Sequence, residues 1–346
     1  MILACDVGGT KTDLALLQPG PDGMEVARRA TYVSREHAAL VDIVVDFVGE
    51  RPPRLEAAGF GIAGPVVGER ARTTNLPWHV DGARLARAVG LPRVSLLNDV
   101  EAQAWAVPLL GEHDRVTLQA GDPAGDGPPG TVAVIAAGTG LGYAALLRGE
   151  GAARSLASEG GHADFSPVDE LEAGLLRALR RDFGRVSVER VVSGPGVHRI
   201  YRYLREQEGV AADDAVDALL DPPDGHVGVD PSAAVARAAL TGTSAVAERA
   251  VLRFLAAYGG EAGNWALRTL ATGGVWLGGG VGHRLLVGPQ GTPSAWRERA
   301  REAFVTRFLA KGRLAPWLAT VPVHVITTDL APLLGAAHCA RMERGR

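Results

Sequence analysis

Short apolar runs separated by glycine turns recur along the chain. Residues 2–7 and 14–17 are two such runs, with a glycine turn at 8–10 between them. The same arrangement returns within 132–147, around a second glycine turn at 138–142. Two apolar runs joined by a short glycine turn predict a pair of strands in a hairpin. The repetition of this unit suggests that the chain has two related halves.

Between and after these units, the pattern alternates between helical and strand spacing. Apolar side chains at 40, 43, 44 and 47 fall on one side of a helix predicted for 36–50. A long region is predicted to be mainly helical, and four further apolar runs are predicted as strands. The helical region is 168–270, and the strands are 55–63, 94–97, 275–277 and 321–327. Alternating strands and helices favour an α/β fold over all-helical or all-β layers.

Composition narrows the class of protein. The 346 residues suffice for two domains, and 47% hydrophobic and 22% charged residues are typical of a soluble globular chain. A net charge of −3 offers no basic field for nucleic acid. The two cysteines, Cys5 and Cys339, lie far apart in the sequence. Two cysteines cannot form a disulfide framework, which suits a reducing cytoplasm.

No segment indicates a membrane or a secretory signal. The N-terminus has no basic region and reaches Asp6 at once, so it does not resemble a signal peptide. The longest uncharged stretch, 130–147, is interrupted by glycines and is interpreted as strand–turn–strand. We therefore expect a cytoplasmic protein without a membrane partner.

The glycine turns suit a polyanionic ligand. Glycine lets backbone N–H groups approach phosphates closely, so turns from two halves of a chain could hold a triphosphate from both sides. Asp6 could hold Mg²⁺, directly or through water, and Thr10 and Thr139 could add hydroxyl groups. The alternative is that these are ordinary hairpin glycines. Neither G-x-x-x-x-G-K-[ST] nor a G-x-G-x-x-G between strand and helix is present, which disfavours P-loop and Rossmann sites.

Asp99 is the candidate general base. It lies at the end of the strand predicted for 94–97, where open α/β sheets present their ligand groups. Phosphoryl transfer needs a group that accepts the proton of the attacking hydroxyl. The alternative is that Asn98 and Asp99 cap the helix that follows, since both residue types are good N-caps. The residues alone favour the cap.

The ordered motifs resemble the bacterial glucokinase family of the actin–hexokinase superfamily. Three glycine motifs look like its two phosphate loops and its adenosine loop, namely Asp6-Val-Gly-Gly-Thr10, Ala137-Gly-Thr-Gly-Leu-Gly142 and Leu277-Gly-Gly-Gly280. Other motifs recur in the family's order over almost the whole chain. They are Gly61-Ile-Ala-Gly-Pro65, Thr74-Asn75, Pro77-Trp78, Asn98-Asp99, Glu159-Gly-Gly-His162, Glu189–Gly196, Lys311-Gly-Arg313 and Leu333-Leu-Gly335. Each motif is weak by itself, but the ordered set is specific.

The resemblance implies an ATP-dependent kinase that phosphorylates the 6-hydroxyl of glucose, with Asp99 as the base and Mg²⁺ as the cofactor. It implies sugar contacts by Asn75, Asn98, Asp99, Glu159, His162 and Glu189. It implies nucleotide contacts by Asp6, Gly8, Gly9, Thr10, Lys11, Gly138, Thr139, Gly140, Gly279 and Gly280.

Without the resemblance, the three charged sugar candidates could serve unrelated purposes. Glu159 could be a surface turn residue, and His162 with Asp164 could be a chance pair of metal-binding type. Glu189 could be favoured by a helix dipole. Only the resemblance assigns them to a sugar.

The implied fold is two actin-like (ribonuclease H-like) α/β domains with a cleft between them. The small domain is expected at 1–109 plus 326–346, and the larger one, with helical insertions, at 110–325. The resemblance also implies a homodimer.

Two positions depart from the family's pattern. The residue after Thr10 is usually Asn, and the residue two places later is usually Arg, whereas this chain has Lys11 and Asp13. Lys11 could contact phosphate or could be a solvated charge on the hairpin.

Three other functions stay open. A kinase of another hexose, such as mannose or N-acetylglucosamine, would keep almost every motif. A non-catalytic sugar sensor would bind sugar without turnover, although retention of Asp99 argues against it. An actin- or chaperone-like ATPase would not need Glu159, His162 and Glu189.

Overall fold

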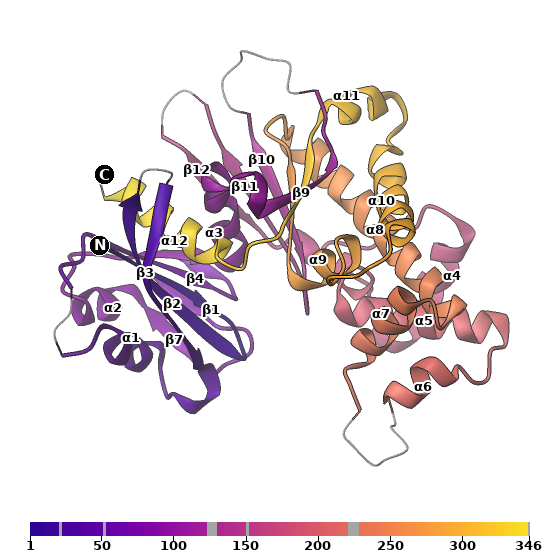
Figure 1. Ribbon diagram of the computed structural model, residues 1–346, viewed down its shortest axis with the longest axis horizontal. Helices are drawn as coiled ribbons and strands as arrows, with labels where there is room; N and C mark the ends of the chain where they lie inside the picture. Colours follow the sequence, from indigo (N-terminus) through magenta and orange to yellow (C-terminus); the bar gives the residue numbers. More distant parts are fainter. Residues whose placement is uncertain (21–22, 51–52, 123–129, 150–151, 221–227, 345–346) are drawn as a thin grey trace. The chain divides into compact units, whose positions relative to one another are not determined.

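Two β-sheets with the same succession of strands organise the chain (Figure 1). The computed structural model describes residues 1–20, 23–50, 53–122, 130–149, 152–220 and 228–344. By compactness the chain divides into two units. The first unit is 1–115, 144–157 and 327–346, and the second is 116–143 and 158–326. Strands β9, β11 and β12 each cross a boundary between these ranges.

The first sheet has the strand order β3-β2-β1-β4-β8. Its strands are β1 (Ile2–Val7), β2 (Lys11–Gly20), β3 (Gly23–Val33), β4 (Ala57–Ile62) and β8 (Ser95–Asn98). Strands β1 and β2 are antiparallel, as are β2 and β3, whereas β4 runs parallel to β1 and β8 parallel to β4. The carboxyl ends of β1, β4 and β8 therefore meet at one edge, which is where Asp6 and Asn98 lie.

The second sheet has the order β12-β11-β10-β13-β14-β9. Its strands are β9 (Arg115–Gln119), β10 (Val132–Ala137), β11 (Leu141–Leu147), β12 (Arg154–Ser158), β13 (Val275–Gly278) and β14 (Val323–Ile326). Strand β13 runs parallel to both β10 and β14. Apart from the added edge strand β9, the succession repeats that of the first sheet. The repeat that the two hairpin units suggest is thus present in the sheets.

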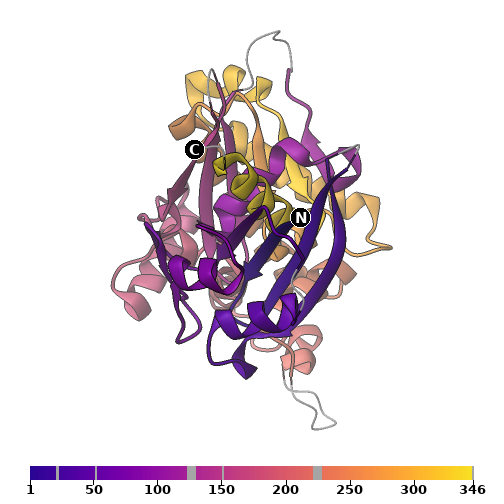
Figure 2. The same ribbon diagram turned by 90° about the vertical axis from the view of Figure 1, so that its left-hand side faces the viewer.

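Helices cover both faces of the first sheet. They are α1 (Leu40–Val48), α2 (Gly82–Ala88), α3 (Asp99–Ala106) and α12 (Ala331–Glu343). Leu3, Cys5 and Val7 of β1 share one core with the apolar side chains of α1 and α2. The C-terminal helix α12 lies against β1 and β4 on the other side (Figures 1 and 2). A small three-stranded sheet completes this unit, with β5 (Val66–Val67), β6 (Arg70–Arg72) and β7 (His79–Asp81).

Glycines allow α12 to approach its neighbours closely. A Cβ on Gly335 would lie 1.6 Å from the carbonyl oxygen of Ala102 in α3. A Cβ on Gly59 of β4 would lie 2.0 Å from the carbonyl oxygen of Ala336. Neither distance is compatible with a side chain, so these two glycines set how α3, α12 and β4 pack.

Three helices of the second unit, α5 (Gly194–Glu208), α7 (Pro231–Thr241) and α10 (Ser294–Leu309), pack against the 25-residue helix α8 (Ala245–Thr269). The others are α4 (Glu170–Phe183), α6 (Asp214–Leu220), α9 (Gly280–Leu286) and α11 (Ala315–Thr320). Tyr258 of α8 meets Phe304 of α10 edge to face, with Phe254 of α8 beside Tyr258. The mainly helical region predicted for 168–270 is therefore confirmed.

The observed elements bear out the expected α/β fold class. The helix predicted for 36–50 begins at Leu40, and its buried side chains include Leu40, Ile43, Val44 and Phe47 as expected. Both cysteines are buried, and neither forms a disulfide. None of the helices in the described ranges is long and apolar enough to span a membrane. The expected domain boundaries, at 109 and 326, stay a prediction.

Candidate active site

The first glycine turn joins β1 to β2 and is fixed by hydrogen bonds. The N–H of Gly8 donates to the carbonyl oxygen of Lys11 at 2.9 Å, and Ser34 Oγ donates to the carbonyl oxygen of Gly8 at 2.9 Å. A Cβ on Gly9 would lie 2.7 Å from the Cβ of Asn75. Glycine thus lets the turn lie directly against Asn75, so two parts of the predicted site come together.

Asp6 stands at the end of β1 among other carboxylates. Burial raises the pKa of Asp6 to about 7, with further increases from Asp99 and Asp13 and opposing effects of Lys11 and Arg29. Asp6 and Asp99 are therefore close enough to repel each other when both are ionised. An added cation would relieve this repulsion.

The site fits Mg²⁺ better than a metal that needs a full protein cage. Among the described residues, no three His, Cys, Asp or Glu side chains form a metal-binding group. Mg²⁺ is commonly held by one or two carboxylates, with substrate phosphates and water as the other ligands. Asp6, next to a glycine turn suited to phosphate, offers this kind of partial site.

Asn98, and not Asp99, is the N-cap of helix α3. Asn98 Oδ1 accepts from the N–H of Val100 at 2.9 Å, and Glu101 Oε2 accepts from the N–H of Asn98 at 3.1 Å. The Nδ2 of Asn98 donates to the carbonyl oxygen of Gly64 at 3.3 Å. Asp99 lies in the first turn, and its Oδ1 also accepts from Val100 N–H, at 3.0 Å. The capping box belongs to Asn98, so Asp99 is not required as the cap.

The second glycine turn is tied to Glu189. It joins β10 to β11, and the N–H of Gly138 donates to the carbonyl oxygen of Gly140 at 2.9 Å. Glu189 Oε2 accepts from the N–H of Leu141 at 3.0 Å, and a Cβ on Gly140 would lie 2.7 Å from the same oxygen. A predicted sugar residue and a predicted phosphate turn therefore touch each other.

Glu159 is the N-cap residue of a short 3-10 helix at Gly160–His162, and His162 is the last residue of that helix. His162 Nε2 lies 3.9 Å from Glu159 Oε2, and both side chains are exposed. The N–H of Val188 donates to the carbonyl oxygen of Ala163 at 2.9 Å, which places the segment of Glu189 beside that of His162. Asp164 pairs with Arg185 at 2.7 Å. Because Asp164 is so engaged, its spacing from His162 does not indicate a metal site.

The third glycine motif, at 277–280, contributes Gly280 to the wall of a pocket of about 380 Å³ in the second unit. Gly138, Thr139 and Gly280 line it, together with the apolar side chains of Val197, Ala236, Val281 and Leu285. Gly279 adopts φ +81°, and a Cβ there would lie 2.3 Å from the carbonyl oxygen of Ala137. The pocket thus joins a turn suited to phosphate with an apolar wall suited to an aromatic base.

The predicted site residues fall into two groups, one in each unit. The group of the first unit comprises Asp6, Gly8, Gly9, Thr10, Lys11, Asn75, Asn98 and Asp99. The group of the second unit comprises Gly138, Thr139, Gly140, Glu159, His162, Glu189, Gly279 and Gly280. Within each group, the contacts described above connect most members.

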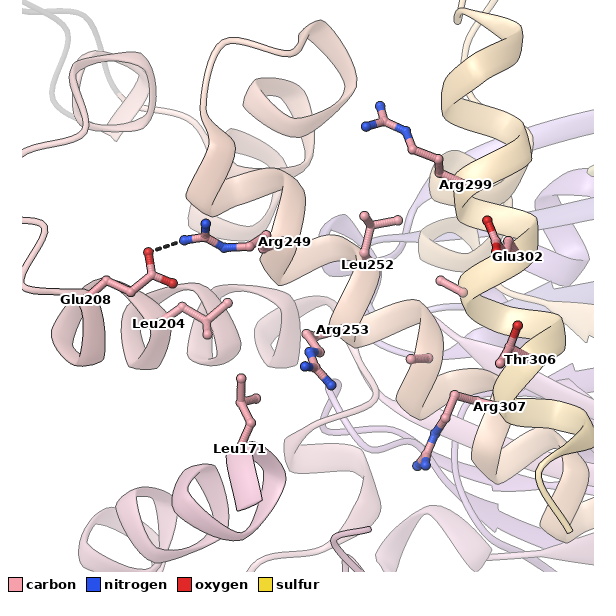
Figure 3. A pocket seen from close by; sticks show the side chains of 12 residues that line it. Leu171, Leu204, Glu208, Arg249, Leu252, Arg253, Arg299, Glu302, Thr306 and Arg307 are labelled. Carbon is pink, nitrogen blue, oxygen red and sulfur yellow. Dashed lines mark hydrogen bonds and ion pairs between the residues drawn. The ribbon is translucent and has the colours of Figure 1, made fainter. Parts of the chain in front are cut away.

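A second hollow in the same unit, of about 640 Å³, contains none of these residues (Figure 3). It lies among α4, α5, α8 and α10, and each of its four arginines forms an ion pair with a carboxylate. The pairs are Arg249–Glu208, Arg253–Asp169, Arg299–Glu248 and Arg307–Glu172. Its positive charge is already matched, so we do not assign it to the active site.

Sequence comparison identifies the family. The glucokinase family model matches residues 3–343. A glucokinase of Nostoc sp. is 39% identical over 350 residues, covering 98% of each chain, and one of Chromobacterium violaceum is 37% identical, covering 97% of this chain and 88% of that one. The chain belongs to the glucokinase family. It is thus an ATP-dependent sugar kinase of the hexokinase type, as the sequence motifs indicate.

Solved structures agree with this family assignment. A glucokinase from an Antarctic psychrotroph has a TM-score of 0.80 at 30% identity, with 98% of each chain covered. A ROK family glucokinase from Streptomyces griseus, in complex with glucose and AMPPNP, has a TM-score of 0.62 at 22% identity, with 98% of this chain and 99% of that one covered. The second likeness concerns the fold alone.

Several lining residues of the pocket in this glucokinase-family chain are not assigned to the nucleotide by the sequence, although two of them, Gly194 and Pro195, belong to the motif Glu189–Gly196. They are Gly194, Pro195, Asp230, Ser232, Ala233 and Arg284. Asp230 Oδ1 caps α7 by accepting from the N–H groups of Ser232 and Ala233 at 3.0 and 3.1 Å. Asp230 followed by a proline is recognisable in the sequence as a helix start. Nothing in that pattern indicates that the same carboxylate also lines a pocket.

Proposed function

We propose that this chain transfers the γ-phosphate of ATP to the 6-hydroxyl of glucose, giving glucose 6-phosphate, with Asp99 as the general base. The observation that carries the proposal is the placement of Asp99. It lies beside Asp6 at the carboxyl edge of the first sheet, while Asn98 supplies the helix cap. A carboxylate in this position is suited to accept a proton next to a site that favours a cation.

The nucleotide is assigned to both glycine turns and to the pocket of the second unit. Gly8, Gly9, Thr10 and Lys11 would contact phosphate, as would Gly138, Thr139 and Gly140, with Gly279 and Gly280 beside the adenosine. The apolar wall of the pocket supports this assignment. The AMPPNP bound to the Streptomyces griseus relative also supports it.

Mg²⁺ would be held by Asp6, directly or through water, and would neutralise phosphate charge when bound. The chain's own residues do the rest. Asp99 orients the 6-hydroxyl and accepts its proton as the oxygen attacks phosphorus, and the N–H groups of the turns hold the phosphate oxygens in line.

Glucose would be bound by Asn75, Asn98, Asp99, Glu159, His162 and Glu189. Two of these residues have only part of their hydrogen-bonding capacity left. Asn98 keeps one Nδ2 hydrogen, because the other faces Gly64, and Glu189 keeps Oε1, because Oε2 accepts from Leu141. A hydrogen bond to a sugar hydroxyl is worth about 0.5–1.5 kcal/mol from the neutral amide of Asn98 and about 1.5–3 kcal/mol from the charged Glu189, so one remaining atom suffices for a useful contact.

The same proposal includes a homodimer in the cytoplasm. Sedimentation analysis of the purified protein would then give twice the 36.1 kDa of one chain.

The decisive variant is Asp99→Asn. Asparagine keeps an oxygen that can accept from Val100 N–H, so the fold is retained while the base is removed. We expect kcat to fall by about 10²- to 10⁴-fold with glucose affinity changed only a few-fold. The matched control is Glu101→Gln, which removes the same charge from the same helix turn and should leave kcat within a few-fold. Near-normal turnover of Asp99→Asn would show that the base is another group.

A sugar panel tests the substrate. ADP release is measured with Mg-ATP and glucose, mannose, fructose, N-acetylglucosamine or no sugar. Release with glucose alone supports the proposal, and release with a different hexose keeps the mechanism but changes the substrate. Sugar binding without ADP release would indicate a sensor, and release without sugar an ATPase.

A further inference from the structure

Asp13 is an unexpected residue in the middle of the first sheet. It lies directly opposite Asp6 in the register of β1 and β2, and directly opposite Thr31 in the register of β2 and β3. Its side chain is only 5% exposed. Like charges on directly opposed residues destabilise a sheet, so a second acid facing Asp6 needs a compensating reason.

Two hydrogen-bond donors engage both oxygens of the Asp13 carboxylate, and a third cationic group lies slightly farther away. Lys11 Nζ donates to Oδ2 at 2.8 Å, and Thr31 Oγ1 donates to Oδ1. Arg29 Nη2 lies 3.8 Å from Oδ2, and its Nη1 pairs with Asp329 at 2.9 Å. The carboxylate is therefore fixed in orientation, and its closest cationic partner is Lys11.

Lys11 is the first residue of β2, and its carbonyl closes the glycine turn by accepting from Gly8 N–H. Its side chain is 60% exposed, yet its ammonium group is held at Asp13. A lysine side chain is flexible and carries a compact charge that binds phosphate well. Holding it on a buried anchor reduces the entropy that it must lose when it contacts a ligand beside the turn.

We infer that Asp13 is a positioning residue, which anchors Lys11 beside the turn at 8–10 so that the ammonium group contacts the phosphates of the nucleotide. This inference rests on the proposed nucleotide site, and it accounts for both departures from the family's usual residues together. Lys11 acts on the ligand, and Asp13 acts through Lys11.

The test measures nucleotide binding without turnover. Calorimetric titration of Mg-AMPPNP, in the absence of sugar, is compared for wild type, Lys11→Met, Asp13→Asn and the double variant. Asp329→Asn is the matched control, because it removes an equal charge from the same cluster without touching Lys11. Thermal melting of each variant shows that it is folded.

We expect Kd to rise about 10- to 100-fold in Lys11→Met and by a similar factor in Asp13→Asn, as for the loss of one charged contact. The double variant should bind no more weakly than Lys11→Met, and Asp329→Asn should stay within twofold of wild type. If Asp13→Asn fails to fold, Thr31→Val replaces it, because it leaves the carboxylate charged but less firmly oriented, and its Kd should rise by a smaller factor.

An unchanged Kd in the folded Asp13 or Thr31 variant would overturn the inference, as would additive effects in the double variant. Failure of the proposed function gives a different result, since wild type itself would then show no sugar-dependent ADP release whatever these affinities are.

Discussion

Glu189 contacts the second glycine turn and is also assigned to the sugar. One of its carboxylate oxygens accepts from the backbone of that turn. Glu159 is also assigned to the sugar, but its contact within the unit is to the exposed His162. The two glutamates should therefore respond differently to truncation.

We expect Glu189→Ala to raise KM for both glucose and ATP, because it removes a sugar contact and leaves Leu141 N–H without its acceptor. Glu159→Ala should raise KM for glucose, by about 10- to 100-fold, and leave KM for ATP within twofold. Initial rates with each substrate varied in turn distinguish the two cases. If Glu189→Ala raised KM for glucose alone, as Glu159→Ala is expected to do, the dual role of Glu189 would be contradicted.

At the scale of single residues, the sequence indicates candidate site residues but not the contacts that those residues make. The carboxylates and glycines stand out because their types and order match a family. Asp230 does not, because a capping aspartate looks the same whether or not it also lines a pocket. The cap of α3 illustrates the opposite case, since only coordinates decide that Asn98, rather than Asp99, completes the capping box.

The packing of helix α12 against α3 buries His338 and so lowers the pKa of its side chain on folding. His338 Nδ1 lies 2.8 Å from the carbonyl oxygen of Trp105, and the two rings meet edge to face at 5.5 Å. Burial lowers the pKa of His338, Arg341 and Arg148 lower it further, and the hydrogen bond to Trp105 opposes them. The folded protein therefore binds this proton less readily than the unfolded chain does.

It follows that the contribution of His338 to stability is complete above a pH of about 6.5 and is lost as the pH falls through the folded pKa. Urea unfolding at several pH values between about 5 and 8 checks this, with His338→Gln as the comparison. All other titrating groups are common to both proteins, so the difference in unfolding free energy should change across this window. A constant difference would show that His338 titrates alike in both states.

Elements with a clear apolar rhythm were predictable, and those without it were not. Helix α1 follows from Leu40, Ile43, Val44 and Phe47. Strand β3 is absent from the expectation because most of its side chains are exposed or only partly buried, including the paired positive charges at 28 and 29. An edge strand is held by backbone pairing with one neighbour, so its side chains need not alternate in the usual way.

The residues assigned to the sugar come from both units of the chain. Asn98 and Asp99 belong to the first unit, and Glu159, His162 and Glu189 belong to the second. Hydrogen exchange can test that division directly. We expect glucose to slow amide exchange at residues 98–106 and also at 159–163 and 188–191. Mannitol, which cannot form the ring, is the control and should protect neither set. Protection confined to one unit would contradict the assignment of sugar contacts to both.

The position of α12 has a consequence for how the protein is made. This helix covers β1 and β4, yet its residues are synthesised long after those of the two strands. At roughly 5–20 residues per second, the ribosome needs on the order of tens of seconds to reach it after finishing β8. During that interval the nascent sheet lacks the cover that α12 provides, while the stretch 158–326 emerges as one continuous block. Chaperone dependence should therefore fall on the N-terminal strands, whose core can close fully only after α12 has emerged.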